Sequence, residues 1–452
     1  MPVDGRTLLA GACYIASAAV CCVLASNGHA PFGDLHIYRA GGAAVLHGAR
    51  LYDLRFAWNL GFTYPPFAAL VFTAFAAMPW PVVPPVVTTI SVVLLPVTFW
   101  LALRLPRGPR ARRGPRVPCA PHGPLGQLED HRAATLALAA ATAAVWLEPV
   151  RTNLAYGQIN LVITALILYD LSRRDSARLK GAAIGLATGL KLTPAIFVLY
   201  LAATRRYRAA AVSAGTFSLT VLAGFAAAPS DSARFWAGTF VNPARIGRVE
   251  NAANQSLRGA LARVLHTANV QPWWLPAAVI VGLAGLGLAV AAARGGDEAA
   301  GFSLCAITAL LVSPVSWSHH WVLAVPALLL CAVSGWRGRS RRLIAAATVL
   351  AVAGWSRIIW QVPIGQGRHA ELRLDPLQLG YSDAYVAAGL AVLAVAAWRL
   401  APGRLVPPRL AGASRRVGEH THDRSDTDSD VVTAAHHLGG ADEVDEVLGE
   451  PR

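Results

Sequence analysis

Residues 181–203 read GAAIGLATGLKLTPAIFVLYLAA, an apolar run that Lys191 and Pro194 interrupt near its middle. Basic residues flank the run on both sides: Arg178, Lys180, Arg205, Arg206 and Arg208. Because basic loops stay on the inner side of a membrane, both ends of the run belong there. The run therefore predicts two short helices that meet at a polar apex. Irregular backbone at that depth must be covered by protein or line a water-filled cavity.

The rest of the chain has the composition of a membrane protein. Of its 452 residues, 55% are hydrophobic and 14% charged, whereas soluble domains carry about a quarter charged residues. Helices are the only membrane-spanning backbone other than closed barrels. We therefore predict an all-α integral membrane protein with about 10–12 transmembrane or re-entrant helices. The other apolar runs are 7–26, 67–103, 133–150, 159–171, 209–228, 276–293, 299–315, 321–334, 343–360 and 384–400.

Charge is distributed unevenly along the chain. The net charge is +15, although residues 412–452 hold ten of the 25 acidic and only four of the 40 basic residues. The arginines before this segment lie between apolar runs, which is typical of cytoplasmic loops and not of a nucleic-acid partner. The segment itself has no apolar period, so we expect a disordered, acidic cytoplasmic tail after a membrane domain at 1–411.

The positions of the basic loops predict the topology. The basic cytoplasmic loops include a long Pro/Arg-rich one at 104–132. Three polar loops then face outward, at 27–66, 229–275 and 361–383. The cell membrane would thus hold a multi-pass protein whose polar residues gather on the periplasmic side.

The first outer loop contains Asp34, His36 and Tyr38, and ends in Tyr64. An aspartate held within hydrogen-bond reach of a hydroxyl can accept its proton as a general base. The alternative is structural, because an aspartate before an apolar-periodic stretch is a good helix N-cap.

Lys191 is charged within an apolar hairpin, which costs about 2.5–3.5 kcal/mol on insertion scales unless the side chain meets water or a partner. Its ammonium group suits a phosphate. The alternative is that the side chain extends to the membrane interface.

Other polar groups lie at predicted helix boundaries. His319 and His320 are adjacent, so on a helix they point about 100° apart, which argues against a metal site and favours hydrogen bonds to phosphate or sugar, or packing at the interface. Amide side chains suit sugar hydroxyls or helix caps; they include Gln158, Asn160 and Asn254, the last close to Arg258.

Taken together, these motifs resemble glycosyltransferase family 87, in order and spacing across residues 7–400. The motifs are Asp34-Leu-His-Ile-Tyr38, Tyr64-Pro-Pro-Phe67, Gly157-Gln158-Ile-Asn160-Leu, Gly189-Leu-Lys191-Leu-Thr-Pro194, Asn254-Gln255-Ser256 and Ser313-Pro-Val-Ser316-Trp-Ser-His319-His320. The resemblance implies a GT-C-type helix bundle. It also implies an actinobacterial mannosyltransferase that uses polyprenyl phosphomannose and forms α-(1,2) linkages on phosphatidylinositol mannosides or lipoglycans such as lipomannan.

The resemblance assigns roles to the polar residues. Asp34 would be the general base on the acceptor hydroxyl, and the reaction would invert the anomeric centre. The donor phosphate would meet Lys191, His319, His320 and Arg258. The substrate-binding residues would be His36, Tyr38, Tyr64, Gln158, Asn160 and Asn254.

Several alternatives stay open at this point. An arabinofuranosyltransferase that uses decaprenyl phosphoarabinose would share the loop acid. A transporter or flippase of a lipid-linked sugar would also contain an intramembrane lysine and broken helices. We expect no divalent metal, because apart from Asp53 few carboxylates lie near Asp34.

Overall fold

The structure is a computed structural model that describes residues 4–26, 32–56, 60–106, 130–241, 245, 247–338, 340–364 and 369–400. Residues 1–402 form one unit. The predicted tail, 412–452, and residues 107–129 of the predicted basic loop lie outside the described residues.

The described part is helical, as predicted, and its β contacts are two isolated bridges. The helices of its first half are α1 (Gly5–Ser26), α2 (Gly33–Leu46), α3 (Pro66–Ala76), α4 (Val83–Leu103), α5 (Asp130–Ala144), α6 (Glu148–Tyr156), α7 (Asn160–Ser172), α8 (Ala182–Leu190), α9 (Ala195–Ala203) and α10 (Tyr207–Ala227). Those of the second half are α11 (Pro229–Trp236), α12 (Leu257–Val264), α13 (Gln271–Arg294), α14 (Glu298–Val312), α15 (Val325–Arg337), α16 (Arg341–Ser356), α17 (Pro376–Ser382) and α18 (Ala384–Leu400). The 3-10 helices used below are η1 (Leu51–Asp53), η3 (Trp80–Val82), η6 (Ser318–Leu323), η7 (Ile358–Trp360) and η8 (Ala370–Arg373).

Several helices of the described part have the length and composition of membrane spans. Four qualify singly, and up to six if each of two bent helix pairs counts as one span. Five further apolar helices of 10–17 residues are shorter than the bilayer core requires of a straight helix. The prediction of an all-α membrane protein is confirmed.

The predicted hairpin at 181–203 is present as α8 and α9. Between them Lys191 adopts an extended conformation, with φ −155° and ψ 132°. The predicted break in 67–103 is also present, since η3 separates the short α3 from the 21-residue α4.

The predicted span at 133–150 is broken in the structure, so it is not one straight helix. Helix α5 ends at Ala144, and α6 begins at Glu148 after a bend of 81°. Pro149 is the physical reason, because proline fits the first turn of a new helix but lacks the N–H that a continuing helix needs.

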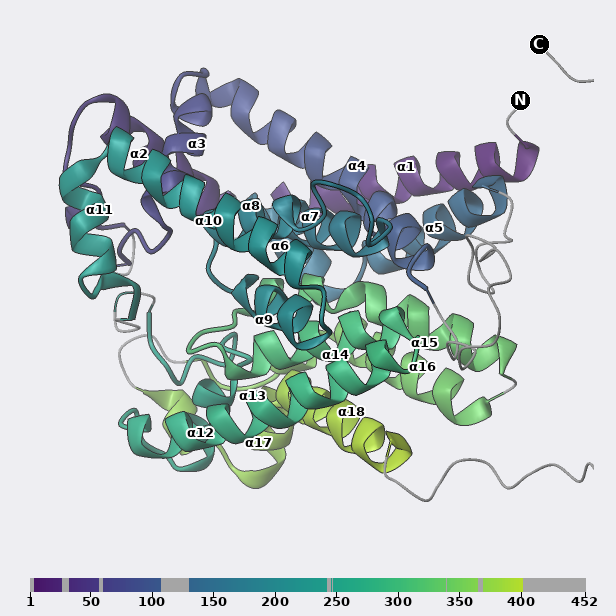
Figure 1. Cartoon of the computed structure of the whole chain (residues 1–452). Coiled ribbons are helices and arrows are strands. Elements are labelled where there is room, and N and C mark those ends of the chain that lie inside the picture. The colour runs from purple at the N-terminus through teal and green to yellow at the C-terminus, as the bar shows by residue number, and fades with distance from the viewer. Residues whose placement is uncertain are drawn as a thin grey trace, which may run out of the picture. The chain divides into compact units, whose positions relative to one another are not determined.

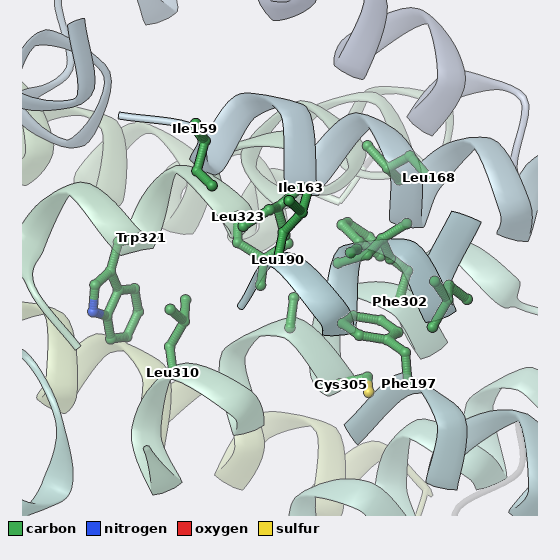
Figure 2. Packing of buried hydrophobic residues seen from close by; sticks show 14 of the residues in the cluster. Ile159, Ile163, Leu168, Leu190, Phe197, Phe302, Cys305, Leu310, Trp321 and Leu323 are labelled. Atoms are coloured by element: carbon green, nitrogen blue, oxygen red, sulfur yellow. The ribbon is translucent and has the colours of Figure 1, made fainter. Parts of the chain in front are cut away.

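Tight side-chain packing holds the helices around the hairpin together. Figure 2 shows Leu190 and Phe197, from α8 and α9, among buried residues of α7, α14 and η6. Phe197 stacks on Phe302 of α14 with ring centroids 6.0 Å apart. Because lipid is as apolar as these side chains, such close contacts rather than water exclusion stabilise helix association.

The predicted outer loops contain short helices that gather near one end of the bundle. Figure 1 shows α11 close to α3, and α12 beside α17. Helix α11 contacts η1 and α3, while α12 contacts α17 and η8. Segments far apart in the sequence thus meet at this end.

Candidate active site

Asp34 lies in the first turn of α2. The N-cap of this helix is Phe32, which has φ 58° and makes no side-chain capping bond, so the capping alternative for Asp34 is wrong. Instead, Gln158 Nε2 donates a hydrogen bond of 2.6 Å to Asp34 Oδ2. The backbone N–H of Phe32 donates to Ala155 O at 2.7 Å, which ties the start of α2 to α6.

Gln158 is placed by the end of α6. Gly157 terminates this helix in the left-handed conformation, with φ 68°, and a Cβ atom there would lie 3.0 Å from the Leu35 side chain. Glycine is therefore required both by conformation and by the close approach of α2. This turn directs the amide of Gln158 toward Asp34.

Two tyrosines continue the network from Gln158. Tyr38 Oη donates to Gln158 Oε1 at 2.6 Å and lies 3.0 Å from Tyr64 Oη. Tyr38 and Asp34 are one helical turn apart on α2, so they share a face. Tyr38 is fully buried, and Tyr64 is nearly so.

Lys191 points into the protein. Its Nζ donates to Asn160 Oδ1 at 3.0 Å and lies 2.9 Å from His320 Nε2. The ammonium also lies 5.7 Å from the centroid of the Tyr64 ring. These contacts show that polar groups of the protein surround the ammonium.

His319 and His320 belong to η6, which packs against α6 and α7. Asn160 Nδ2 donates to the backbone oxygen of His319 at 3.3 Å. The His319 ring meets Tyr156 edge to face, and its buried Nε2 has no hydrogen-bond partner in the structure. Within the described ranges, no three His, Cys, Asp or Glu side chains come together as a metal site.

The amides join the acidic and basic ends of the site. Asn160 Nδ2 lies 3.4 Å from Gln158 Oε1, so hydrogen bonds run from Asp34 through Gln158 and Asn160 to Lys191 and His320. Burial raises the pKa of the Asp34 carboxyl, while the Gln158 hydrogen bond and the Lys191 charge oppose that shift. The site therefore combines a carboxylate of increased basicity with a cation and hydrogen-bond donors.

Three of the predicted site residues lie elsewhere. His36 is exposed on α2 and stacks on Trp80, with ring centroids 3.9 Å apart. Arg258 of α12 lies 5.7 Å from the centroid of the Trp274 ring. Asn254 is fully buried and accepts a hydrogen bond from the Ser316 backbone N–H at 3.1 Å. None of their hydrogen bonds or ring contacts in the structure joins them to Asp34 or Lys191.

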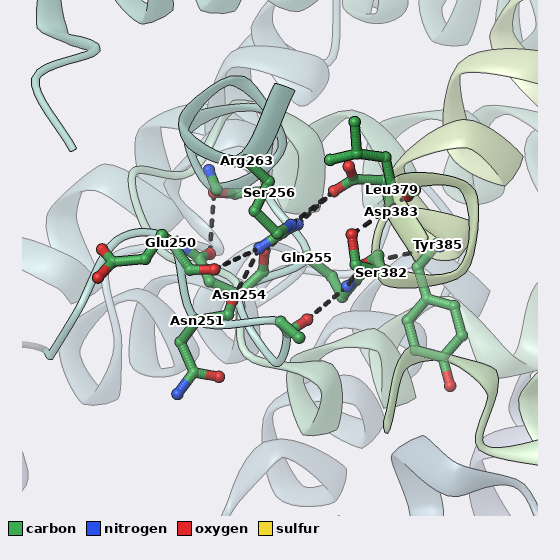
Figure 3. A network of polar contacts seen from close by, with 12 residues as sticks. Glu250, Asn251, Asn254, Gln255, Ser256, Arg263, Leu379, Ser382, Asp383 and Tyr385 are labelled. Atoms are coloured by element: carbon green, nitrogen blue, oxygen red, sulfur yellow. Dashed lines mark hydrogen bonds and ion pairs between the residues drawn. The ribbon is translucent and has the colours of Figure 1, made fainter. Parts of the chain in front are cut away.

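Asn254 belongs to a buried polar network that supports η6. Figure 3 shows Arg263 of α12 at its centre, paired with Asp383 and bonded to the backbone around Asn254. Gln255 adds a bond from its backbone N–H to Ser316 O at 2.7 Å. The network thus fixes the segment that leads into His319.

Glu148 is a residue that sequence reasoning missed. It is fully buried at the start of α6 and accepts hydrogen bonds from Ser318 at 2.7 Å, Trp360 at 3.0 Å and Tyr385 at 2.9 Å. It therefore anchors η6, next to His319, to α6 and α18. The signal was available, because a carboxylate within an apolar run is functional or structural by default.

An apolar groove adjoins η6 and Glu148. The groove lies between α14, α15, α16 and α18. Its empty volume is about 720 Å³, which includes space open to the outside. Its lining includes Leu147, Pro149, Trp321, Val325 and Tyr385. One of its lining residues, Trp321, directly follows His320 in η6.

Comparison with known proteins identifies the family. The model of glycosyltransferase family 87 matches residues 62–314. A polyprenol-phosphate-mannose-dependent alpha-(1-2)-phosphatidylinositol mannoside mannosyltransferase of Mycolicibacterium smegmatis is 34% identical, over 90% of this chain and 89% of the relative. The protein of the same name from Mycobacterium tuberculosis is 34% identical, over 74% of this chain and 77% of the relative. No solved structure matches. The chain belongs to glycosyltransferase family 87.

Proposed function

We propose that this enzyme transfers mannose from polyprenyl phosphomannose to a phosphatidylinositol mannoside and forms an α-(1,2) linkage. The names of the two relatives support both substrates and the linkage. The observation that carries the proposal is the hydrogen-bonded path from Asp34 to Lys191, because a carboxylate and a cation in one site are what a phosphosugar transfer needs. The arabinose-donor and transporter alternatives lack comparable support.

Asp34 acts as the general base. The acceptor hydroxyl oxygen attacks the anomeric carbon of mannose, and the hydroxyl proton passes to a carboxylate oxygen of Asp34. The bond between the anomeric carbon and the phosphate oxygen breaks with its electron pair on the phosphate. One displacement of this kind inverts the anomeric centre. The burial that raises the pKa of Asp34 makes it a stronger base than an exposed aspartate.

Lys191 and His320 stabilise the leaving group. Polyprenyl phosphate gains negative charge as the glycosidic bond breaks, and a preorganised cation at that point lowers the barrier. Asn160 holds the ammonium of Lys191 in place. The unpartnered Nε2 of His319 adds a hydrogen-bonding group near the same position. Because Lys191 supplies the charge, the proposed reaction requires no divalent metal, and transfer persists in the presence of EDTA.

The polyprenyl chain of the donor occupies the apolar groove beside η6. A lipid-linked sugar places its phosphate at headgroup depth and its chain among apolar helices. The groove, whose lining includes Tyr385 and Trp321, the residue after His320, supplies such a surface. The site faces the periplasm of the cell membrane, because the basic loops mark the opposite side.

A reconstitution assay tests the proposed reaction. The purified protein, in liposomes, receives polyprenyl phosphate carrying labelled mannose, or in a parallel sample labelled arabinose, together with a phosphatidylinositol mannoside acceptor. We expect label in a new glycosidic bond with the mannose donor alone. Transfer of arabinose instead, or movement of the labelled donor across the bilayer without a new bond, would refute the proposal.

A further inference from the structure

Four arginines surround the short helix η1. Arg234 Nη1 lies 2.6 Å from Asp53 Oδ1, and Arg50 Nη1 lies 3.9 Å from Asp53 Oδ2. Arg55 and Arg245 both donate to the backbone oxygen of Tyr52. We call Arg50, Arg55, Arg234 and Arg245 the arginine cluster. It joins the first predicted outer loop to the second.

Positive charge in the arginine cluster exceeds the negative charge around it. Its nearby carboxylates are Asp53, which is half-exposed, and Asp231, which accepts a hydrogen bond from Leu51 N at 3.1 Å. Burial, with the charges of Arg55 and Arg234, lowers the pKa of Arg245. Like charges held this close cost free energy unless an anion neutralises them.

The cluster also has hydrogen-bonding capacity to spare. The Nε of Arg245 is buried without a hydrogen-bond partner in the structure. Arg50 and Arg234 are accessible, with 83% and 45% of their side-chain surfaces exposed. Guanidinium groups bind phosphate in a planar, two-point geometry that lysine does not offer. An oxyanion is therefore the ligand that the cluster fits.

Tyr52 connects the cluster to the active site. Its Oη donates to the backbone oxygen of Tyr64 at 2.9 Å, and Tyr64 Oη meets Tyr38 Oη. The Tyr52 ring stacks on Phe235 of α11, with ring centroids 5.5 Å apart. Arg234 is the residue before Phe235, so this contact keeps it beside η1. Tyr52 and Tyr64 therefore link the cluster to Tyr38 of the active site.

We propose that the arginine cluster binds the phosphodiester of the acceptor glycophospholipid. This inference rests on the proposed function, in which both lipid substrates carry a phosphate. Lys191 and His320 lie at the buried position suited to the donor phosphate, so the acceptor phosphate needs a second cationic site. The accessible cluster supplies it on the side of Tyr38 and Tyr64.

The double variant Arg55→Gln/Arg245→Gln tests this assignment and leaves the pairs around Asp53 intact. Its kinetics are measured in neutral-lipid vesicles with polyprenyl phosphomannose and two acceptors: a phosphatidylinositol mannoside, and an alkyl mannoside of matched chain length that lacks phosphate. A matched control is Arg174→Gln/Arg178→Gln, which removes two exposed arginines from the loop between α7 and α8. A second variant, Arg55→Lys/Arg245→Lys, keeps the charge.

For the phosphatidylinositol mannoside, we expect the acceptor KM of the glutamine variant to rise roughly 10- to 100-fold, the scale of one or two charge-assisted hydrogen bonds. The lysine variant recovers part of this loss, and the control matches the wild type. With the alkyl mannoside, the glutamine variant and the wild type have the same KM and kcat, which also shows that the variant is folded.

Other results would overturn the assignment. They are an unchanged acceptor KM, an equal loss with both acceptors, or a rise in the donor KM, which would place the donor phosphate at the cluster. A loss that the control variant shares would reveal a response to total charge. Failure of the wild type to transfer mannose to either acceptor would instead refute the proposed function.

Discussion

The acidity of Asp34 controls the pH range in which the enzyme works. A general base must be unprotonated, and burial raises the pKa of this carboxyl above that of an ordinary aspartate. Activity should therefore disappear as the pH falls through the raised pKa, at a higher pH than the usual value of about 4 would give. Initial rates of transfer at saturating donor, measured from about pH 4 to 8, provide the profile. An acidic limb at or below the ordinary aspartate value would contradict the assignment.

Lys191 is predicted to act on the transition state rather than on folding. Lys191→Gln keeps a polar side chain, but the leaving phosphate loses its cation. By analogy with the loss of one oxyanion donor, kcat should fall roughly 100- to 1,000-fold. Single-turnover rates with labelled donor measure this step. A variant whose KM changes while its kcat does not would show that Lys191 contributes ground-state binding alone.

Eight of the eleven residues selected from the sequence lie together around Asp34 and Lys191. Lys191 was identifiable from its charge within an apolar run, whereas Asp34, which also suited a helix cap, was selected on the family motif. The sequence did not show that His36 faces Trp80 or that Asn254 is saturated by backbone contacts, because both outcomes depend on tertiary packing. The carboxylate of Glu148 within an apolar run was a usable signal, but its partners in η6, η7 and α18 could not be predicted because they lie far away in the sequence.

Helix α2 carries Asp34, and its contact with α3 fixes its position. A Cβ atom at Gly42 would lie 2.2 Å from the backbone oxygen of Phe72, and backbone cannot move aside as a side chain can. Gly42→Ala should therefore destabilise the protein by about 1–3 kcal/mol, the usual cost of overpacking. It should also reduce transfer by displacing Asp34. Thermal unfolding in detergent, with Gly33→Ala as a control in open space, measures the first effect. If Gly42→Ala and Gly33→Ala had equal melting temperatures, the close contact between α2 and α3 would not contribute to stability.

The apolar runs of the sequence predicted the positions of most helices. They did not predict where one run is divided into two helices. The runs 159–171 and 384–400 became α7 and α18 almost unchanged. The run 133–150 became two helices because Pro149 starts a new one, and the resulting bend places Glu148 inside the bundle. Proline position, together with the apolar pattern, would have predicted this break.

The proposed reaction requires Asp34 and Lys191 to face one compartment. Their shared hydrogen-bond path satisfies this requirement within the structure. The compartment can be identified by labelling a variant whose six native cysteines are replaced. We expect a membrane-impermeant maleimide to label His47→Cys in intact spheroplasts, and Arg178→Cys only after permeabilisation. The reverse pattern would place the active site in the cytoplasm.

The most direct test compares two aspartates in the same reconstituted transfer reaction. Asp34→Asn removes the proposed base, whereas Asp375→Asn changes the exposed N-cap of α17, a position that asparagine fills equally well. With labelled polyprenyl phosphomannose and a phosphatidylinositol mannoside, we expect Asp34→Asn to be at least about 100-fold slower than the wild type, and Asp375→Asn to match it. Transfer by Asp34→Asn at the wild-type rate would contradict the account.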